Sequence, residues 1–246
     1  MCLVVLAYKV HPAFPLIVLA NRDEFLDRPA LPAHAWQDAP HIFAGRDVQA
    51  GGTWLGVTRS GRFAALTNYR DLTVVPRNGP SRGALVRRAL DQDIAAADTV
   101  EYERFNLIHG EVDALRYINN VDGADRVLEP GVHGLSNHLL DTPWPKVERA
   151  KKDLSRIISS SAAEPTENLF AAMMRTDRAP DEHLPDTGVP LELERALSAA
   201  FISLPGYGTR CTTLVTVNDN GRVFFEERGH VPPGRVRYSF PIERSA

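Results

Sequence analysis

The sequence predicts an α+β fold in which antiparallel sheets are covered by helices. Apolar and β-branched runs are grouped at the beginning, in the middle and at the end of the chain. Neighbouring runs are mostly joined by short connections with Gly, Asn, Asp or Pro, which are typical of antiparallel hairpins. Segments with helical periodicity lie between these groups. Two stacked sheets between two helix layers, a four-layer αββα sandwich, would accommodate every element.

The first expected hairpin pairs two apolar runs, residues 1–9 and 16–20. A Pro-flanked connection over 11–15 turns the chain back, and the second run ends in the polar stretch Asn21-Arg22-Asp23-Glu24. Antiparallel pairing brings the end of the second run beside the start of the first. We therefore expect Arg22 and Asp23 to lie close to Cys2.

The middle of the chain begins with a long loop, residues 27–50, whose length suggests that it covers something. Gly51-Gly52 follows and is expected to serve the backbone as a bulge or a close approach. Ser81 is the expected N-cap of a helix. Three elements are predicted between residues 53 and 102. They are a hairpin over 53–58 and 63–67, a helix over 83–90 and a short helix within 94–102.

The second half of the chain is also expected to contain strands, then helices, then strands. The segments expected as strands are 105–109, 114–118 and 125–128, then 211–217, 223–226 and 236–240, and the expected helices are 146–158, 166–174 and 191–200. We find no internal repeat, no low-complexity tract and no break in composition that would mark a linker. The chain is therefore expected to form one domain, residues 1–246.

Composition limits the classes of function. With 246 residues and 43% hydrophobic content the chain can bury a substantial core, and a net charge of -3 offers no basic stripe for nucleic acid. Two cysteines, Cys2 and Cys211, provide no disulfide framework and favour a reducing compartment. Lys9 interrupts the first apolar run, no basic segment precedes it, and no stretch approaches membrane-spanning length. The expected location is the cytoplasm.

Familiar ligand-binding motifs are missing from the sequence. The eight histidines form no metal constellation, since His133 and His138 are best interpreted as loop residues. There is no phosphate-binding glycine loop, no Gly-x-Ser-x-Gly elbow and no dinucleotide fingerprint. We therefore expect neither a metal nor a resident cofactor.

Several stretches together carry a family resemblance. Asn21-Arg22-Asp23-Glu24 behind a Met-Cys start resembles the NRDE family, that of the transport and Golgi organisation protein 2 homologues. Further matching stretches are residues 51–57, 65–70, 134–137 and 208–213. That family is similar to cysteine-type N-terminal-nucleophile (Ntn) hydrolases, particularly choloylglycine hydrolases and penicillin V acylases. The resemblance implies an Ntn-hydrolase-like αββα sandwich, which agrees with the layout expected from the residues.

The resemblance also implies a site. The positions that match the catalytic residues of those enzymes are Cys2, Arg22, Asp23, Asn68, Asn137 and Arg210. Asn21, Trp54 and Tyr69 stand within the matching stretches and are expected to contact the substrate, although Trp54 could serve either in the core or as a pocket wall. The Arg-Asp spacing is tighter here than in the choloylglycine hydrolases.

These residue types suit acyl transfer to water from a small amide or thioester. A thiol attacks as the thiolate, and the α-amine of Cys2, freed by removal of Met1, has a reference pKa of about 7.7–8.0 and can accept its proton. Asp23 would orient the resulting ammonium, and Arg22 or Arg210 would favour the thiolate. An Asn68 side-chain N–H with a backbone N–H would form an oxyanion hole.

Two kinds of alternative stay open at this point. Cys2 could open a strand as a small apolar residue, Arg22 and Asp23 could form a structural ion pair, and Asn68 and Asn137 could be turn residues. The second function considered is a non-catalytic carrier of haem or lipid that uses the same cleft, with the Cys2 thiolate or a histidine as the iron ligand. A free α-amine on Cys2 is required by the hydrolase and not by the carrier.

Overall fold

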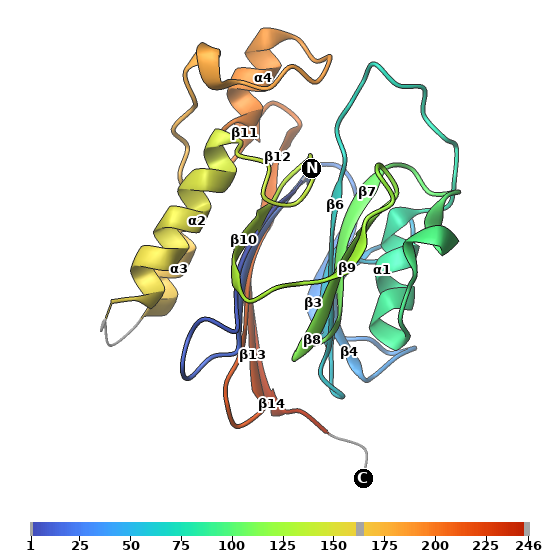
Figure 1. Cartoon of the computed structure of the whole chain (residues 1–246), viewed down its shortest axis with the longest axis vertical. Helices are drawn as coiled ribbons and strands as arrows, with labels where there is room; N and C mark the ends of the chain where they lie inside the picture. The colour runs from blue at the N-terminus through green and yellow to red at the C-terminus, as the bar shows by residue number, and fades with distance from the viewer. Residues whose placement is uncertain (1, 161–164, 244–246) are drawn as a thin grey trace.

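The computed structural model describes residues 2–160 and 165–243, and Figure 1 shows the arrangement of their elements. The strands are β1 (Cys2–Tyr8), β2 (Leu16–Phe25), β3 (Ala30–Ala35), β4 (Ile42–Asp47), β5 (Leu55–Thr58), β6 (Arg62–Asn68), β7 (Phe105–Glu111), β8 (Ala114–Asn119), β9 (Asp125–Val127), β10 (Gly131–Leu135), β11 (Ser203–Leu204), β12 (Tyr207–Val217), β13 (Arg222–His230) and β14 (Pro233–Pro241). The helices are α1 (Arg82–Asp91), α2 (Pro145–Ile158), α3 (Pro165–Met173) and α4 (Leu191–Leu197), with short 3₁₀ turns at Ala96–Thr99 and Asp181–His183.

Among the described residues these strands form two seven-stranded antiparallel sheets. The first, called here the β2 sheet, has the order β10-β1-β2-β12-β13-β14, with β11 paired to β12. The second, the β6 sheet, has the order β3-β4-β5-β6-β7-β8-β9. The predicted α+β class with antiparallel sheets and helices is confirmed.

The core between the sheets follows from strand alternation, because successive side chains point to opposite faces. Tyr8 and Val18 of the β2 sheet pack in one apolar cluster with Phe63 and Tyr117 of the β6 sheet. At about 25 cal/mol per Å² of apolar surface removed from water, this shared cluster is a principal source of the stability that joins the sheets.

The outer faces of the sheets are covered by helices, as Figure 1 shows. Leu85 and Val86 of α1 pack with Phe105 on the β6 sheet. On the other side, α2 and α3 pack on the odd-numbered residues of β1 and β2, and Leu154 and Leu19 belong to the same apolar cluster. None of the described helices combines the length and the apolar character needed to cross a membrane.

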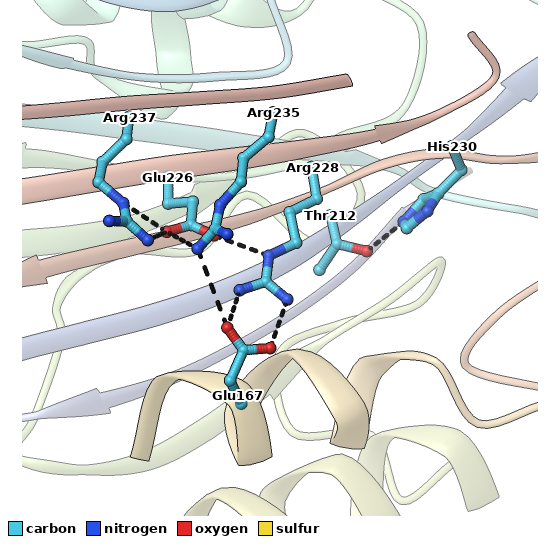
Figure 2. A network of polar contacts seen from close by, with 7 residues as sticks. All are labelled: Glu167, Thr212, Glu226, Arg228, His230, Arg235 and Arg237. Carbon is cyan, nitrogen blue, oxygen red and sulfur yellow. Dashed lines mark hydrogen bonds and ion pairs between the residues drawn. The ribbon is translucent and has the colours of Figure 1, made fainter. Parts of the chain in front are cut away.

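An ionic network fixes α3 to the outer strands (Figure 2). Glu226 of β13 is fully buried and lies 2.7–2.8 Å from nitrogens of Arg228, Arg235 and Arg237. Arg228 also donates to Glu167 of α3 at 2.8 Å. Although burial raises the pKa of Glu226, hydrogen bonds from the arginines outweigh it and lower the pKa overall. The edge of the sheet thus carries paired charges, which also discourage strand-to-strand aggregation.

The predicted long loop over 27–50 is wrong, because this segment contains β3 and β4. These strands pair antiparallel with a register shift between Leu31 and His34, around Pro32. Proline lacks an N–H and is tolerated in a sheet only at an edge or a bulge. Its presence argued against a strand in the sequence, whereas the sheet accommodates Pro32 in an edge strand. The other predicted elements are present, and β12, β13 and β14 extend beyond their predicted ends.

Candidate active site

The predicted hairpin register is confirmed at the start of the chain. Cys2 of β1 pairs with Arg22 of β2, and Arg22 pairs on its other side with Cys211 of β12. The even-numbered residues of β1 and β2 face the second sheet, so Cys2 and Arg22 share that face. Desolvation raises the pKa of the partly buried Cys2 thiol, and nearby Asp23 raises it further, while Arg22 opposes both. The thiol therefore needs a base before it can attack.

A cleft of about 350 Å³ opens at this end of the sheets. Five of the residues predicted for the site line it, and they are Cys2, Arg22, Asp23, Trp54 and Asn68. The cleft is also lined by the first turn of α1, through Ser81, Arg82 and Gly83. Side chains from β1, β2 and β6 and the segment before β5 thus meet around one space.

Arg22 is held by stacking rather than by hydrogen bonds. Its guanidinium lies 4.1 Å from the Trp54 ring centroid and 3.8 Å from a carboxylate oxygen of Asp47, and the side chain is 5% exposed. Asp47 is bound more closely by Arg28, at 2.7 Å. Within residues 2–160 and 165–243 the Arg22 side chain donates no hydrogen bond, so its guanidinium N–H groups are available to the cleft.

Asp23 lies at the edge of the cleft and on the helix-covered side of β2. It accepts a hydrogen bond of 2.6 Å from the Thr209 hydroxyl. Burial raises the pKa of Asp23, and the charge of Lys146 opposes this effect. Lys146, in the first turn of α2, is 3% exposed, and burial lowers its pKa to about 8 despite the attraction of Asp23. Asp23 and Lys146 therefore form a buried pair in which the charge of each group favours the ionised form of the other.

Asn21 is occupied by contacts that hold the helices. Its side-chain NH₂ donates to the carbonyls of Met173 and Ala200, both at 2.8 Å, and its side-chain oxygen accepts from Thr212 at 2.7 Å. Thr212 in turn lies 2.9 Å from a ring nitrogen of His230, as Figure 2 shows. Asn21 is not among the residues that line the cleft. Asn21 therefore has a structural position, in which its side chain joins β2 to the helix layer by hydrogen bonds.

The two predicted asparagines have different positions. Asn68 ends β6 and lines the cleft. Asn137 is fully buried behind it and donates to the backbone oxygen of Asn68 at 2.9 Å. Its neighbour Ser136 donates to the backbone oxygen of Cys2 at 3.1 Å. The turn after β10 therefore joins the strand of Cys2 to the strand of Asn68.

Arg210 and Tyr69 do not line the cleft in this structure. Arg210 lies in a β-bulge of β12 and donates to the carbonyls of Phe25, at 3.0 Å, and Val231, at 3.1 Å. It lines a neighbouring cavity instead. The Tyr69 hydroxyl lies 3.0 Å from a ring nitrogen of His138. The structure brings Cys2, Arg22, Asp23, Asn68 and Trp54 together and places the other predicted residues around them.

The role expected for Gly51-Gly52 is confirmed. Gly51 has a φ of +74°, in the left-handed region. A Cβ on Gly52 would lie 2.2 Å from the backbone carbon of Gly83, and the Thr53 N–H donates to the Gly83 carbonyl at 3.2 Å. The glycines allow the loop to touch the first turn of α1 and so close one end of the cleft.

No group of three or more His, Cys, Asp or Glu that could hold a metal ion is found in the described part of the chain.

Comparison with known proteins decides the family. The family model described as "Transport and Golgi organisation 2" matches residues 1–231. The chain belongs to the Transport and Golgi organisation 2 family. It is 34% identical to the Homo sapiens homolog over 93% of this chain and 92% of that protein, and 32% identical to the Bos taurus homolog over 97% and 96%. A solved structure of a Caenorhabditis elegans N-acylethanolamine-hydrolyzing acid amidase ortholog covers 87% of this chain and 92% of its own, at 9% identity and a TM-score of 0.45.

Three residues of this Transport and Golgi organisation 2 family chain were missed by reasoning from the sequence. Arg82 lines the cleft, yet in sequence it is one of several arginines near a helix start. Lys146 opens an amphipathic helix, where a lysine is normally solvated. Ser136 stood within a matching stretch, and its position beside Asn137 was the one available signal.

Proposed function

We propose that this chain is a cysteine Ntn-type hydrolase with an αββα sandwich, in which Cys2 transfers an acyl group from a small amide or thioester to water. The observation that carries the proposal is the meeting of Cys2, Arg22, Asp23 and Asn68, from three strands, around one cleft of about 350 Å³. A thiol, a cation, a carboxylate and an amide donor are the parts of an activated nucleophile with an oxyanion hole.

The first half-reaction would proceed at the Cys2 sulfur. Removal of Met1, which lies outside the described residues, would free an α-amine to take the thiol proton. The thiolate attacks the substrate carbonyl, the new C–S bond forms, and the bond to the leaving amine or thiol breaks as that group receives the proton. Water then attacks the acyl-enzyme carbonyl and gives one proton to the α-amine, the C–S bond breaks, the carboxylic acid is released, and the sulfur of Cys2 regains its proton from the amine. Arg22, paired with Cys2 across the hairpin, opposes the desolvation that disfavours the thiolate.

Asn68 and Asp23 supply the remaining roles in this proposal. Asn68 ends its strand at the cleft and is held there through its backbone by Asn137, so its side-chain N–H can donate to the developing oxyanion. One such donor is typically worth about 2.7–4 kcal/mol in the transition state. Asp23, whose backbone hydrogen-bonds to the Cys2 thiol, would orient the ammonium with its carboxylate, and the nearby charge of Lys146 favours the ionised form of Asp23.

The carrier alternative stays a prediction with less support from the site. Haem needs an axial ligand, and no histidine is among the described residues that line the cleft, which leaves the Cys2 thiol as the one soft donor there. The residues present therefore fit haem poorly, and we derive no step through it.

The cytoplasmic location likewise stays a prediction.

The proposal is tested with an electrophilic acyl probe and intact mass. The native protein should lack Met1 and gain one acyl group on Cys2, with turnover of a generic acyl thioester. Cys2→Ala should abolish both labelling and turnover, whereas the matched variant Cys211→Ala should keep them, because Cys211 lies outside the cleft. Cys2→Ser should retain some reactivity if the amine is the base.

An insertion variant separates the N-terminal mechanism from a simple reactive thiol. A glycine placed between Met1 and Cys2 keeps the thiol and moves the amine by one residue, so it should impair turnover nearly as much as Cys2→Ala. Full activity of this variant, or full activity of protein that retains Met1, would refute the Ntn mechanism.

A further inference from the structure

A second cavity of about 270 Å³ lies beside the Cys2 cleft. Arg22 and Trp54 line both spaces, so their stack forms the wall between them. The cavity is lined by β3 and by the turn between β13 and β14. Its wall is largely apolar, with Leu31, Val231 and Val236 among the lining side chains.

One polar group in this cavity is only partly satisfied within the fold, although the Cys211 thiol and the Thr213 hydroxyl lie close to it. Glu227 of β13 is 3% exposed, and its Oε1 accepts a hydrogen bond of 2.8 Å from the Ala33 N–H. Its other oxygen, Oε2, is buried and has no hydrogen-bond partner in the part of the chain that the structure describes. Because an unmade hydrogen bond to a buried polar group is costly, such a group calls for a ligand or another function.

The charges around the cavity limit what can bind there. Arg210 is committed to backbone carbonyls, and Arg235 is paired with Glu226. Arg22 keeps its charge against the same space, which disfavours a cationic ligand. Burial raises the pKa of Glu227, which favours the protonated carboxyl, whereas the Ala33 N–H, the Cys211 thiol and the charge of Arg22 lower it. A hydroxyl can accept from a protonated carboxyl or donate to an ionised one, and therefore satisfies Oε2 in both states.

We propose that this cavity is a binding site for a neutral aliphatic alcohol, whose hydroxyl pairs with Glu227 Oε2 and whose apolar body lies against Leu31, Val231 and Val236. The site is separate from the nucleophile, although the Arg22–Trp54 wall makes the two spaces neighbours. An apolar ligand in a largely preformed pocket with one or two polar contacts is the usual composition of a small-molecule site.

Cys211 provides a reporter inside the cavity itself. It lines the space, and in a Cys2→Ala protein it is the sole thiol, because the chain has two cysteines. The experiment measures the rate at which methyl methanethiosulfonate, a small neutral reagent, modifies Cys211 at alkaline pH. We expect saturating 1-octanol to slow this modification at least tenfold, whereas octylammonium and octanoate at equal concentration should slow it less than threefold.

Variants at Glu227 test the polar contact. Glu227→Leu should weaken protection by 1-octanol at least tenfold in apparent affinity, and Glu227→Gln, which keeps a donor and an acceptor, should retain most of it. Absence of protection, equal protection by all three octyl probes, or equal affinity of the two variants would overturn the proposal. The comparison of probes needs no variant at Glu227, so it decides the matter even if Glu227→Leu does not fold. Since the reporter protein lacks Cys2, these outcomes are independent of the proposed hydrolase activity.

Discussion

Replacing Lys146 by methionine should stabilise the protein at neutral pH. The side chain is 3% exposed and burial lowers its pKa from 10.5 to about 8. At 1.36 kcal/mol per pKa unit, this lowering corresponds to about 3 kcal/mol of unfavourable free energy for the charged amine. The figure already contains the attraction of Asp23, because that attraction acts on the same pKa. Methionine has a similar length and carries no charge.

The sign of the pH dependence follows from proton linkage. Below pH 8 both the folded and the unfolded states hold the Lys146 proton, so the full penalty is present. Between pH 8 and 10.5 the unfolded state binds more protons, and the contribution of Lys146 makes the wild type more stable as pH rises. The advantage of Lys146→Met should therefore fall by about 2 kcal/mol between pH 7 and pH 10.

Urea unfolding of both proteins at pH 7 and pH 10 measures this difference. Titrating groups that do not interact with Lys146 are common to both proteins and cancel in the comparison. Lys152→Met removes the same charge from an exposed position on α2 and should change stability by less than about 0.5 kcal/mol. If the difference between Lys146→Met and the wild type does not vary with pH, the lysine is not held in the buried state described here.

Two further substitutions probe the packing of the β6 sheet. Gly45→Ala should destabilise the protein by about 1–3 kcal/mol in urea unfolding, because a Cβ there would lie 2.4 Å from two atoms of the Trp54 ring; retention of wild-type stability would show that the ring moves freely. Both ring nitrogens of His109 are buried without a partner in the described residues, and burial lowers its pKa, so the unfolded state takes up a proton first as pH falls below 6.5. His109→Leu should therefore lessen the loss of stability between pH 7 and pH 5, and an unchanged acid profile would contradict this assignment.

The sequence was most informative where local pattern and register coincide. Two apolar runs with a short connection specify a hairpin, and its register alone brings Arg22 opposite Cys2. The same alternation explains why Asn21 is absent from the cleft. It has the opposite parity to Cys2 and Arg22 in the paired strands and so faces the helices, where it binds Met173 and Ala200. This placement could have been derived from the period of two.

Other features depend on contacts that no local pattern encodes. Arg210 lies in a bulge that shifts the register between Thr209 and Cys211, so strand alternation does not give its direction. Gly45 in β4 lowers the apparent strand tendency of its segment, yet the glycine is required because the Trp54 ring occupies the space of its Cβ. Tertiary packing overrides local propensity at both positions.

The polar stretch at the end of β2 serves two environments because a strand presents alternate residues to opposite faces. Arg22 faces the space between the sheets, where it meets Trp54, whereas Asn21 and Asp23 belong to the face that α2 and α3 cover. Asp23, near the end of that strand, also reaches the edge of the cleft. Through it the charge of Lys146 in the helix layer is coupled to the surroundings of the Cys2 thiol. A change in the helix layer, such as Lys146→Met, therefore acts on the site without touching the cleft, and it should do so through the ionisation of Asp23.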